Sequence, residues 1–338
     1  MYSRIIVPLD GSPFSEMALP YARVIAGSLA IPLELVEAFD VLPPVARHRQ
    51  SSEDTRRMLE DAQRSSRTYL ERIQQALRSD GLVAFTTTLP GPPARALVDW
   101  LVREPEALVV MSTHGRGGIA RWAMGSVADK VLHSIPNPVL LIRTNAESAP
   151  ADRVEVEVET VLVPLDGSEL SAQSLPHAAA VAAGLGARIT LIQVTGTADF
   201  YRRYLDRASA EEGLISAEEL VRADSEDART SLVDASRRLA QEFGYGGQVT
   251  VTHLQGQNPA EAIVEIAGSE PTMIVMTTHG RSGINRLVLG SVTDRVVRHA
   301  IAPVLVVRRH DEPGAIGMEA RASEGFSAGF GNAATQPA

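Results

Sequence analysis

The chain repeats one stretch, Met111-Ser-Thr-His-Gly-Arg-Gly-Gly-Ile-Ala-Arg-Trp-Ala-Met-Gly-Ser126, as Met276-Thr-Thr-His-Gly-Arg-Ser-Gly-Ile-Asn-Arg-Leu-Val-Leu-Gly-Ser291. Ten of the sixteen positions are identical. Each copy follows an apolar run typical of a buried strand and leads into a helical pattern. A strand, a glycine-rich loop and a helix N-terminus in this order let backbone N–H groups converge on an anion. The repeat therefore predicts two anion-binding loops, and the alternative is a purely structural connection.

Length and composition limit what the protein can be. The 338 residues have room for two domains, and 44% hydrophobic residues with only 4% aromatic residues predict aliphatic cores. The formal charge of −9 argues against a general nucleic-acid-binding surface. The absence of cysteine excludes disulfides and thiol catalysis. Neither a signal sequence nor an apolar run near the ~20 residues of a membrane span is present, so we expect a soluble cytoplasmic protein.

The chain contains a single lysine, Lys130, inside a predicted helix. A P-loop needs Gly-Lys-Ser or Gly-Lys-Thr after its glycines, so this way of binding phosphate is excluded. Any phosphate must be held by backbone N–H groups, hydroxyls and arginines.

A second motif repeats at the start of each copy, as Val7-Pro-Leu-Asp-Gly-Ser12 and Val163-Pro-Leu-Asp-Gly-Ser168. From its aspartate to the Gly-Ser pair of the loop, the second copy is nine residues longer. We place the extra residues within Thr195–Ser225 and predict a lid-like helical insertion there. The predicted domains are residues 1–145 and 160–310, with a linker at 146–159 and a disordered tail at 311–338.

Strand and helix patterns alternate throughout, which predicts right-handed βαβ units. The fold class is therefore α/β, with two doubly wound five-stranded parallel sheets of strand order 3-2-1-4-5. This is a Rossmann-like arrangement, similar to the adenine nucleotide alpha hydrolases. Ligands of such sheets bind at the carboxyl ends of the strands where the winding reverses. Each repeated loop falls at that point, together with Asp10 or Asp166.

These motifs resemble the universal stress protein family in its tandem form, over nearly the whole chain. The resemblance rests on the two Val-Pro-Leu-Asp-Gly-Ser starts, the two Thr-His-Gly-Arg loops with Gly-Ser-Val ten residues on, and the closing Pro-Val-Leu strands. It implies binding of ATP, AMP or ADP, with Mg²⁺ as a companion ion. Nucleotide-binding members carry Gly-x-x-Gly, nine residues, then Gly-Ser or Gly-Thr. Ser112 and Thr277 replace the first glycine and add a Cβ where phosphate or ribose would lie.

The candidate binding residues combine these motifs with the strand ends that the resemblance implies. In the first copy they are Pro8, Leu9, Asp10, Ala38, Met111, Ser112, His114, Gly115, Arg116, Gly125, Ser126 and Val127. In the second copy they are Pro164, Leu165, Asp166, Val194, Met276, Thr277, His279, Gly280, Arg281, Gly290, Ser291, Val292 and Thr293. No catalytic residue or metal ligand is assigned.

Each candidate type has a structural alternative. Asp10 and Asp166 can accept from ribose hydroxyls, or they can hold the Gly-Ser turn. We expect structural roles for the two loop histidines and helix-capping roles for Ser12 and Ser168. Thr293 adds a hydroxyl where the first copy has Ala128, so we expect the second site to be the fuller one.

Three functional hypotheses remain. In the first, adenine nucleotide in one or both domains sets a state that an unidentified protein partner reads during a stress response or in signalling. The domains would form an internal pseudo-dimer through their fifth strands, and the chain could also form a homodimer. In the second, the protein is an interaction module without nucleotide. In the third, it is a slow ATPase.

Overall fold

The computed structural model describes residues 2–40, 52–114, 124–143, 156–208, 216–278 and 289–308, in which helices and strands alternate. Residues up to 143 form the first half and residues from 156 the second half. The first half contains β1 (Arg4–Leu9), α1 (Pro13–Glu16), α2 (Leu19–Leu29), β2 (Leu33–Phe39), α3 (Ser52–Ser79), β3 (Ala84–Pro90), α4 (Pro93–Leu101), β4 (Ala107–Ser112), α5 (Ser126–Ser134) and β5 (Val139–Ile142). The second half contains β6 (Thr160–Leu165), α6 (Glu169–Ala172), α7 (Leu175–Leu185), β7 (Arg188–Thr195), α8 (Ala198–Ala208), α9 (Ala217–Gln241), β8 (Val249–Gln255), α10 (Pro259–Ala267), β9 (Thr272–Thr277), α11 (Ser291–His299) and β10 (Val304–Val307).

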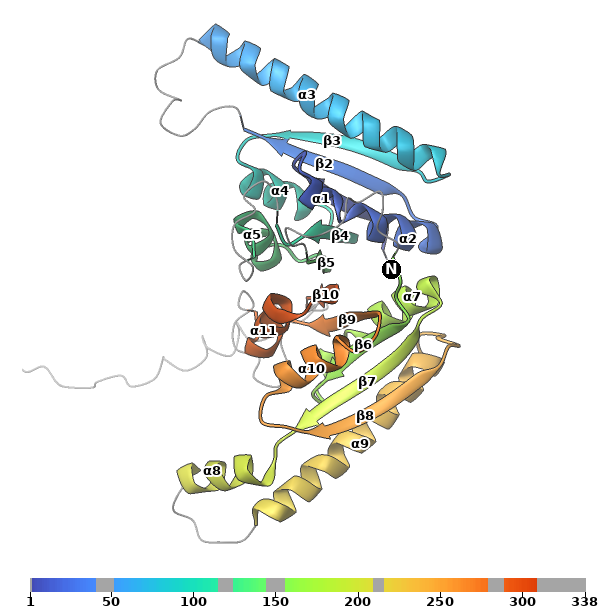
Figure 1. The fold of residues 1–338 in the computed structure, drawn as a ribbon, viewed down its shortest axis with the longest axis vertical. Helices are drawn as coiled ribbons and strands as arrows, with labels where there is room; N and C mark the ends of the chain where they lie inside the picture. The colour runs from blue at the N-terminus through green and yellow to red at the C-terminus, as the bar shows by residue number, and fades with distance from the viewer. Residues whose placement is uncertain are drawn as a thin grey trace, which may run out of the picture.

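The strands form one sheet of ten, in the order β3-β2-β1-β4-β5-β10-β9-β6-β7-β8 (Figure 1). Each half has the predicted order 3-2-1-4-5 with parallel neighbours, which confirms the α/β class and its winding. The two expected sheets are joined edge to edge, because β5 and β10 pair antiparallel with Leu140 opposite Leu305. This pairing uses the inner edge of both halves.

The central strands are apolar throughout because helices cover both faces of the sheet. Successive side chains of β1 alternate between two cores: Ile5 and Val7 belong to one, and Ile6 belongs to the other. Helices α2, α3, α7 and α9 pack over the first core, while α4, α5, α10 and α11 pack over the second. Both cores contain residues from both halves, so the halves share their apolar interior.

Helices α2 and α7 extend the contact between the halves beyond the strands. A Cβ added at Gly184 of α7 would lie 2.5 Å from the Ser28 hydroxyl of α2, so a larger residue would force the Ser28 side chain to move. Nearby, the Tyr2 hydroxyl and His177 Nδ1 form a buried hydrogen bond of 2.5 Å. Burial raises the pKa of Tyr2, which keeps the phenol protonated.

Two arginines connect the halves reciprocally. Arg143, directly after β5, donates to the carbonyl oxygens of Arg298 and Ala300 at the end of α11, at 2.8 and 3.1 Å. Arg308, directly after β10, donates to the carbonyl oxygen of Leu132 in α5. A guanidinium suits this position because the last carbonyls of a helix lack partners and carry partial negative charge. The last strand of each half therefore holds the last helix of the other.

We predict that Arg143→Met and Arg308→Met each lower the free energy of unfolding by about 1–3 kcal/mol, because each leaves carbonyls at a helix end without a charged donor. Urea denaturation measures the change. Arg95→Met is the matched control, since the Arg95 side chain is 83% exposed and pairs with Asp99 one helical turn away. Equal stability of all three variants would contradict the assigned role of the two arginines.

Candidate functional site

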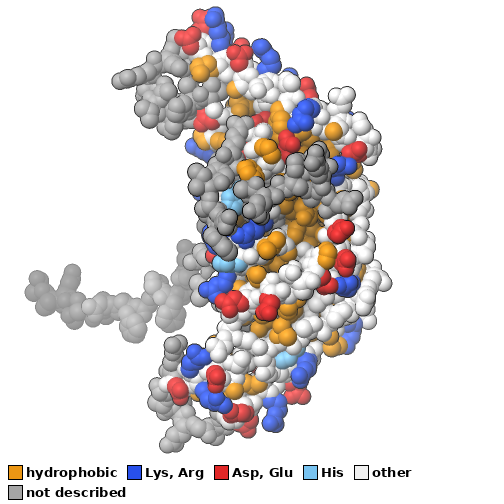
Figure 2. All heavy atoms as spheres, viewed as in Figure 1, with side chains coloured by type: hydrophobic (Ala, Val, Ile, Leu, Met, Phe, Trp, Pro, Cys, Tyr) orange, Lys and Arg blue, Asp and Glu red, His pale blue; other side chains and the backbone are white. Residues whose placement is uncertain are grey.

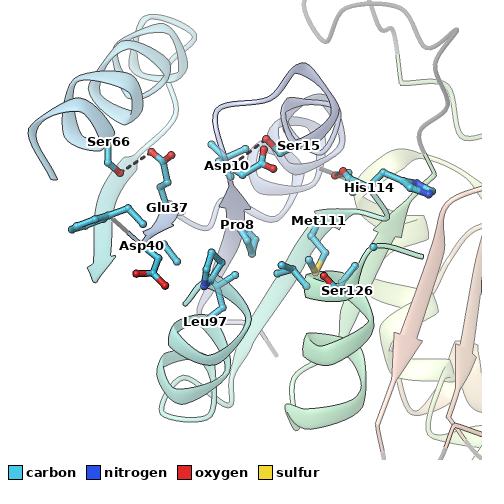
Figure 3. Close-up of a pocket in the computed structure, with 18 of the residues that line it drawn as sticks. Pro8, Asp10, Ser15, Glu37, Asp40, Ser66, Leu97, Met111, His114 and Ser126 are labelled. Carbon is cyan, nitrogen blue, oxygen red and sulfur yellow. Dashed lines mark hydrogen bonds between the residues drawn. The ribbon is translucent and has the colours of Figure 1, made fainter. Parts of the chain in front are cut away.

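Each half contains a cavity at the carboxyl ends of its strands, where the winding reverses between β1 and β4 or between β6 and β9. The first-half cavity has a volume of 810 Å³, and the second-half cavity has a volume of 570 Å³. Figure 3 shows the first-half cavity, with Asp10 between two sides: Glu37 and Ser66 lie on one side, and Met111 and Ser126 lie on the other.

The structure brings most predicted residues together around these cavities. Those that line the first-half cavity are Pro8, Leu9, Asp10, Ala38, Met111, Ser112, His114, Gly125, Ser126 and Val127. Those that line the second-half cavity are Pro164, Leu165, Asp166, Val194, Met276, Thr277, Gly290, Ser291, Val292 and Thr293. The other candidates, Gly115, Arg116, His279, Gly280 and Arg281, lie outside the described residues.

A tight turn follows the first strand of each half. Oδ1 of Asp10 accepts hydrogen bonds from the backbone N–H of Ser12 at 3.0 Å and from its hydroxyl at 2.6 Å. Oδ1 of Asp166 accepts from Ser168 at the same two distances. The intervening residue has a positive φ, 77° at Gly11, which favours glycine. One carboxylate oxygen of each aspartate thus holds the turn, while the residue itself forms part of the cavity wall.

The glycine that precedes α5 lies against the end of β4. The Gly125 N–H donates to the Thr113 carbonyl oxygen at 2.7 Å, and Gly290 repeats the contact with Thr278 at 2.7 Å. A Cβ added at Gly125 would lie 3.0 Å from the same Thr113 oxygen. The φ of Gly125 is −62°, so space rather than backbone conformation requires glycine here.

The helices α5 and α11 begin at these glycines without a side-chain cap. The first N–H groups of a helix have no intrahelical partner, and the helix dipole adds partial positive charge at this end. Ser126 and Val127 line the first-half cavity, and Ser291 and Val292 line the second-half cavity. Each cavity therefore contains a helix end suited to an anion.

Of the two residues that replace the first motif glycine, Ser112 uses its side chain within the protein. The Ser112 hydroxyl donates to the His114 carbonyl oxygen at 2.5 Å, which fixes the start of the loop. In the second half, the Thr293 hydroxyl donates to the Thr277 carbonyl oxygen at 2.8 Å. We expected a fuller second site because Thr293 adds a hydroxyl. This hydroxyl donates its proton within the protein, where it connects α11 to β9.

Carboxylates dominate the charge of the described cavity walls. Asp10, Glu37 and Asp40 line the first-half cavity, while Asp166 and Asp224 line the second. No arginine or lysine is among the described lining residues. On the face drawn in Figure 2, acidic and basic side chains are interspersed. The described residues contain no group of three or more His, Asp or Glu side chains placed to hold a metal ion.

The sequence interpretation missed lining residues that depend on how helices pack against strand ends. Glu37 of β2 accepts from the Ser66 hydroxyl of α3 at 2.7 Å, and both line the first-half cavity. In the second half, Gln193 of β7 lines the cavity, as do Phe200 and Tyr201 of α8. The sequence did contain a signal that could have found Glu37 and Gln193 as lining residues. Each is a polar residue next to the last apolar position of a buried strand. The aromatic pair lies in the segment where we expected a lid-like helix, and α8 occupies that segment.

One histidine lies behind the second-half cavity. The hydroxyl of Thr195, which lines the cavity, forms a hydrogen bond of 2.8 Å with His253 Nε2. Partial burial, with a smaller contribution from Arg229, lowers the pKa of His253. The imidazole is therefore neutral at pH 7 and serves as a hydrogen-bonding group rather than a charge.

The universal stress protein family model matches residues 1–143 and 157–308. The chain belongs to the universal stress protein family. It carries two copies of the family unit, in tandem. No helix among its described residues is both long and apolar enough to span a bilayer.

Curated relatives in this family match the chain over different lengths, one over most of it and another over less than half. A universal stress protein of Mycolicibacterium smegmatis is 25% identical over 309 residues, which cover 90% of this chain and 96% of the relative. A universal stress protein of Methanocaldococcus jannaschii is 33% identical over 150 residues, which cover 44% of this chain and 81% of the relative. The solved structure of a universal stress protein from Archaeoglobus fulgidus superimposes with a TM-score of 0.61 at 18% identity, covering 92% of this chain and all of the other. That likeness supports the Rossmann-like fold.

We predict that Gly125→Ala destabilises the protein by about 1–3 kcal/mol, because the new methyl group is forced against the Thr113 carbonyl and displaces the start of α5. Chemical denaturation measures the loss. Gly246→Ala is the control, since a Cβ there meets no heavy atom within 4 Å. The close approach would be disproved if the two variants were equally stable.

Proposed function

We propose that the protein binds an adenine nucleotide, with ATP as the first candidate, in the cavities of both halves. One observation carries the proposal: each cavity contains a helix N-terminus without a side-chain cap, with an aspartate in the same cavity wall. A hydrogen bond from the glycine N–H to a backbone carbonyl holds this helix start at the strand ends. Both halves have this arrangement. The helix start suits an anionic group of a ligand, and the aspartate suits the polar hydroxyls of the same ligand. Occupancy would set the state that a protein partner reads.

The parts of a nucleotide match distinct parts of each cavity. The phosphates would accept from the first N–H groups of α5 and α11 and from the hydroxyls of Ser126 and Ser291. The ribose would lie near Asp10 or Asp166, whose carboxylates can accept from its hydroxyls. The base would lie against the apolar strand ends at Ala38 or Val194.

Charge favours the second half for a highly charged nucleotide. Among the described lining residues the first-half cavity has three carboxylates and the second has two, so polyphosphate meets more repulsion from them in the first. Mg²⁺ bound to the phosphates would reduce this repulsion. We therefore expect tighter binding of ATP in the second half than in the first.

An interaction module without nucleotide is the second candidate, and the internal roles of the Ser112 hydroxyl and of the aspartate Oδ1 atoms favour it. Under this alternative the cavities are by-products of the fold. Because β5 and β10 pair with each other, a homodimer would have to use a different surface.

We predict that Mg-ATP binds the wild-type protein at two sites and that Ser291→Asp removes the second-half site. A carboxylate at the first position of α11 repels phosphate, yet it stabilises the free helix by about 0.3–1 kcal/mol through the helix dipole. Isothermal titration calorimetry gives the stoichiometry, and thermal unfolding shows that the variant remains folded.

Gln75→Asp is the control, because it adds the same charge on an exposed position of α3. It should bind as the wild type does. If the wild type binds neither ATP, ADP nor AMP, or if Ser291→Asp retains both sites, the nucleotide proposal fails and the interaction module takes its place.

A further inference from the structure

Helix α8 places two aromatic side chains in the wall of the second-half cavity. Phe200 and Tyr201 both line this cavity, and Phe200 is 46% exposed. A single apolar side chain on an open surface needs no explanation. A half-exposed ring that lies in a cavity wall, beside a second ring, is instead a surface that a ligand can cover.

The two rings lie against the end of β7. A Cβ added at Gly196 would lie 2.7 Å from the Phe200 ring and 2.8 Å from the Tyr201 ring, so both rings rest directly on the glycine backbone. The rings are arranged edge to face, with centroids 5.3 Å apart and an angle of 84° between their planes. Gly196 follows Val194 by two residues. The rings therefore lie at the strand end where the proposed function places the base.

The first half differs at the same backbone position. Counted along β2 and β7 from their registers with β1 and β6, Asp40 corresponds to Gly196. Asp40 lines the first-half cavity, whose described lining residues include one phenylalanine, Phe39 of β2, and no tyrosine. The position on which the two rings pack in the second half thus carries a carboxylate in the first.

Hydrogen bonds hold α8 at this cavity from two sides. The Tyr201 hydroxyl donates to Asp224 of α9. Arg203 donates to Oε1 of Gln257, in the turn after β8, at 3.1 Å. Asp224 and Gln257 are themselves lining residues, so the helix is fastened to two other parts of the cavity wall. A ring that is already held in place loses less freedom when a ligand covers it.

We propose that Phe200 is a base-contacting residue of the second-half cavity and that its ring packs on the planar base of the bound nucleotide, with Tyr201 completing the wall. The inference rests on the proposed nucleotide function and assigns a contact that the base makes. Aromatic side chains bind planar bases by stacking, and every base has a face to offer. The contact adds nothing to the binding of phosphate. The second half therefore reads whether its ligand carries a base.

The test reads each cavity separately. Met111 lines the first-half cavity and Met276 lines the second, so methyl-¹³C methionine resonances report the occupancy of each. The full chain is titrated with ATP and with tripolyphosphate, which has no base, both in the presence of Mg²⁺. In Phe200→Ala we expect ATP to bind about fivefold or more weakly at Met276. The affinity for tripolyphosphate at Met276 and the affinity for ATP at Met111 should stay as in the wild type.

Two further variants separate the ring from the helix that carries it. Phe200→Tyr restores a ring and should recover most of the affinity that Phe200→Ala loses. Leu205→Ala is the matched control, because Leu205 is an exposed apolar residue of the same helix and is not among the described lining residues. It should bind ATP as the wild type does. Phe200→Leu, which keeps an apolar side chain without a planar ring, replaces Phe200→Ala if that variant does not fold.

The outcomes separate the two proposals. If neither methionine responds to ATP, the nucleotide function fails and the base contact falls with it. If Met276 responds but Phe200→Ala binds ATP as tightly as the wild type, only the role of Phe200 is overturned. An equal loss for tripolyphosphate, or an equal loss in Leu205→Ala, overturns it as well. The variants decide by ATP alone if tripolyphosphate binds too weakly to be measured.

Discussion

Both cavities depend on one short contact, the hydrogen bond from a glycine N–H to the carbonyl at the end of the fourth strand of its half. It joins Gly125 to Thr113 and Gly290 to Thr278, at 2.7 Å in each case. The contact places the first turn of α5 or α11 beside the strand ends while leaving that turn without a side-chain cap. Unsatisfied N–H groups at a helix start are costly when buried and useful when they face a ligand. The Gly-Ser pairs of the repeated stretch thus position the helix rather than forming a flexible phosphate loop.

The same region connects the two halves. The Thr113 N–H donates to Ile142 of β5, and the next residue, Arg143, reaches the carbonyls at the end of α11. The Thr278 N–H donates likewise to Val307, and Arg308 reaches α5. Because α5 and α11 begin at the cavities and end at these arginines, a continuous set of hydrogen bonds joins the two cavities across the β5–β10 pair.

The sequence predicted the winding of each half and the strand ends that line the cavities, because alternation and apolar runs depend on local neighbours. The residue pattern alone could not predict that β5 and β10 join the halves into one sheet, because four apolar residues in each strand carry no signal for their partner. The expectation of a contact through the fifth strands came from the family resemblance. Nor could the residue pattern show that one oxygen of Asp10 holds a turn, or that Thr293 donates to Thr277. The Glu37–Ser66 pair depends on how a helix is aligned over a strand, which only the fold reveals.

The most direct measurement is a crystal structure of the protein grown with saturating Mg-ATP. The account predicts electron density for a nucleotide in each cavity, with phosphate oxygens about 3 Å from the first N–H groups of α5 and α11. Empty cavities at saturating nucleotide, or phosphates bound away from both helix starts, would contradict it.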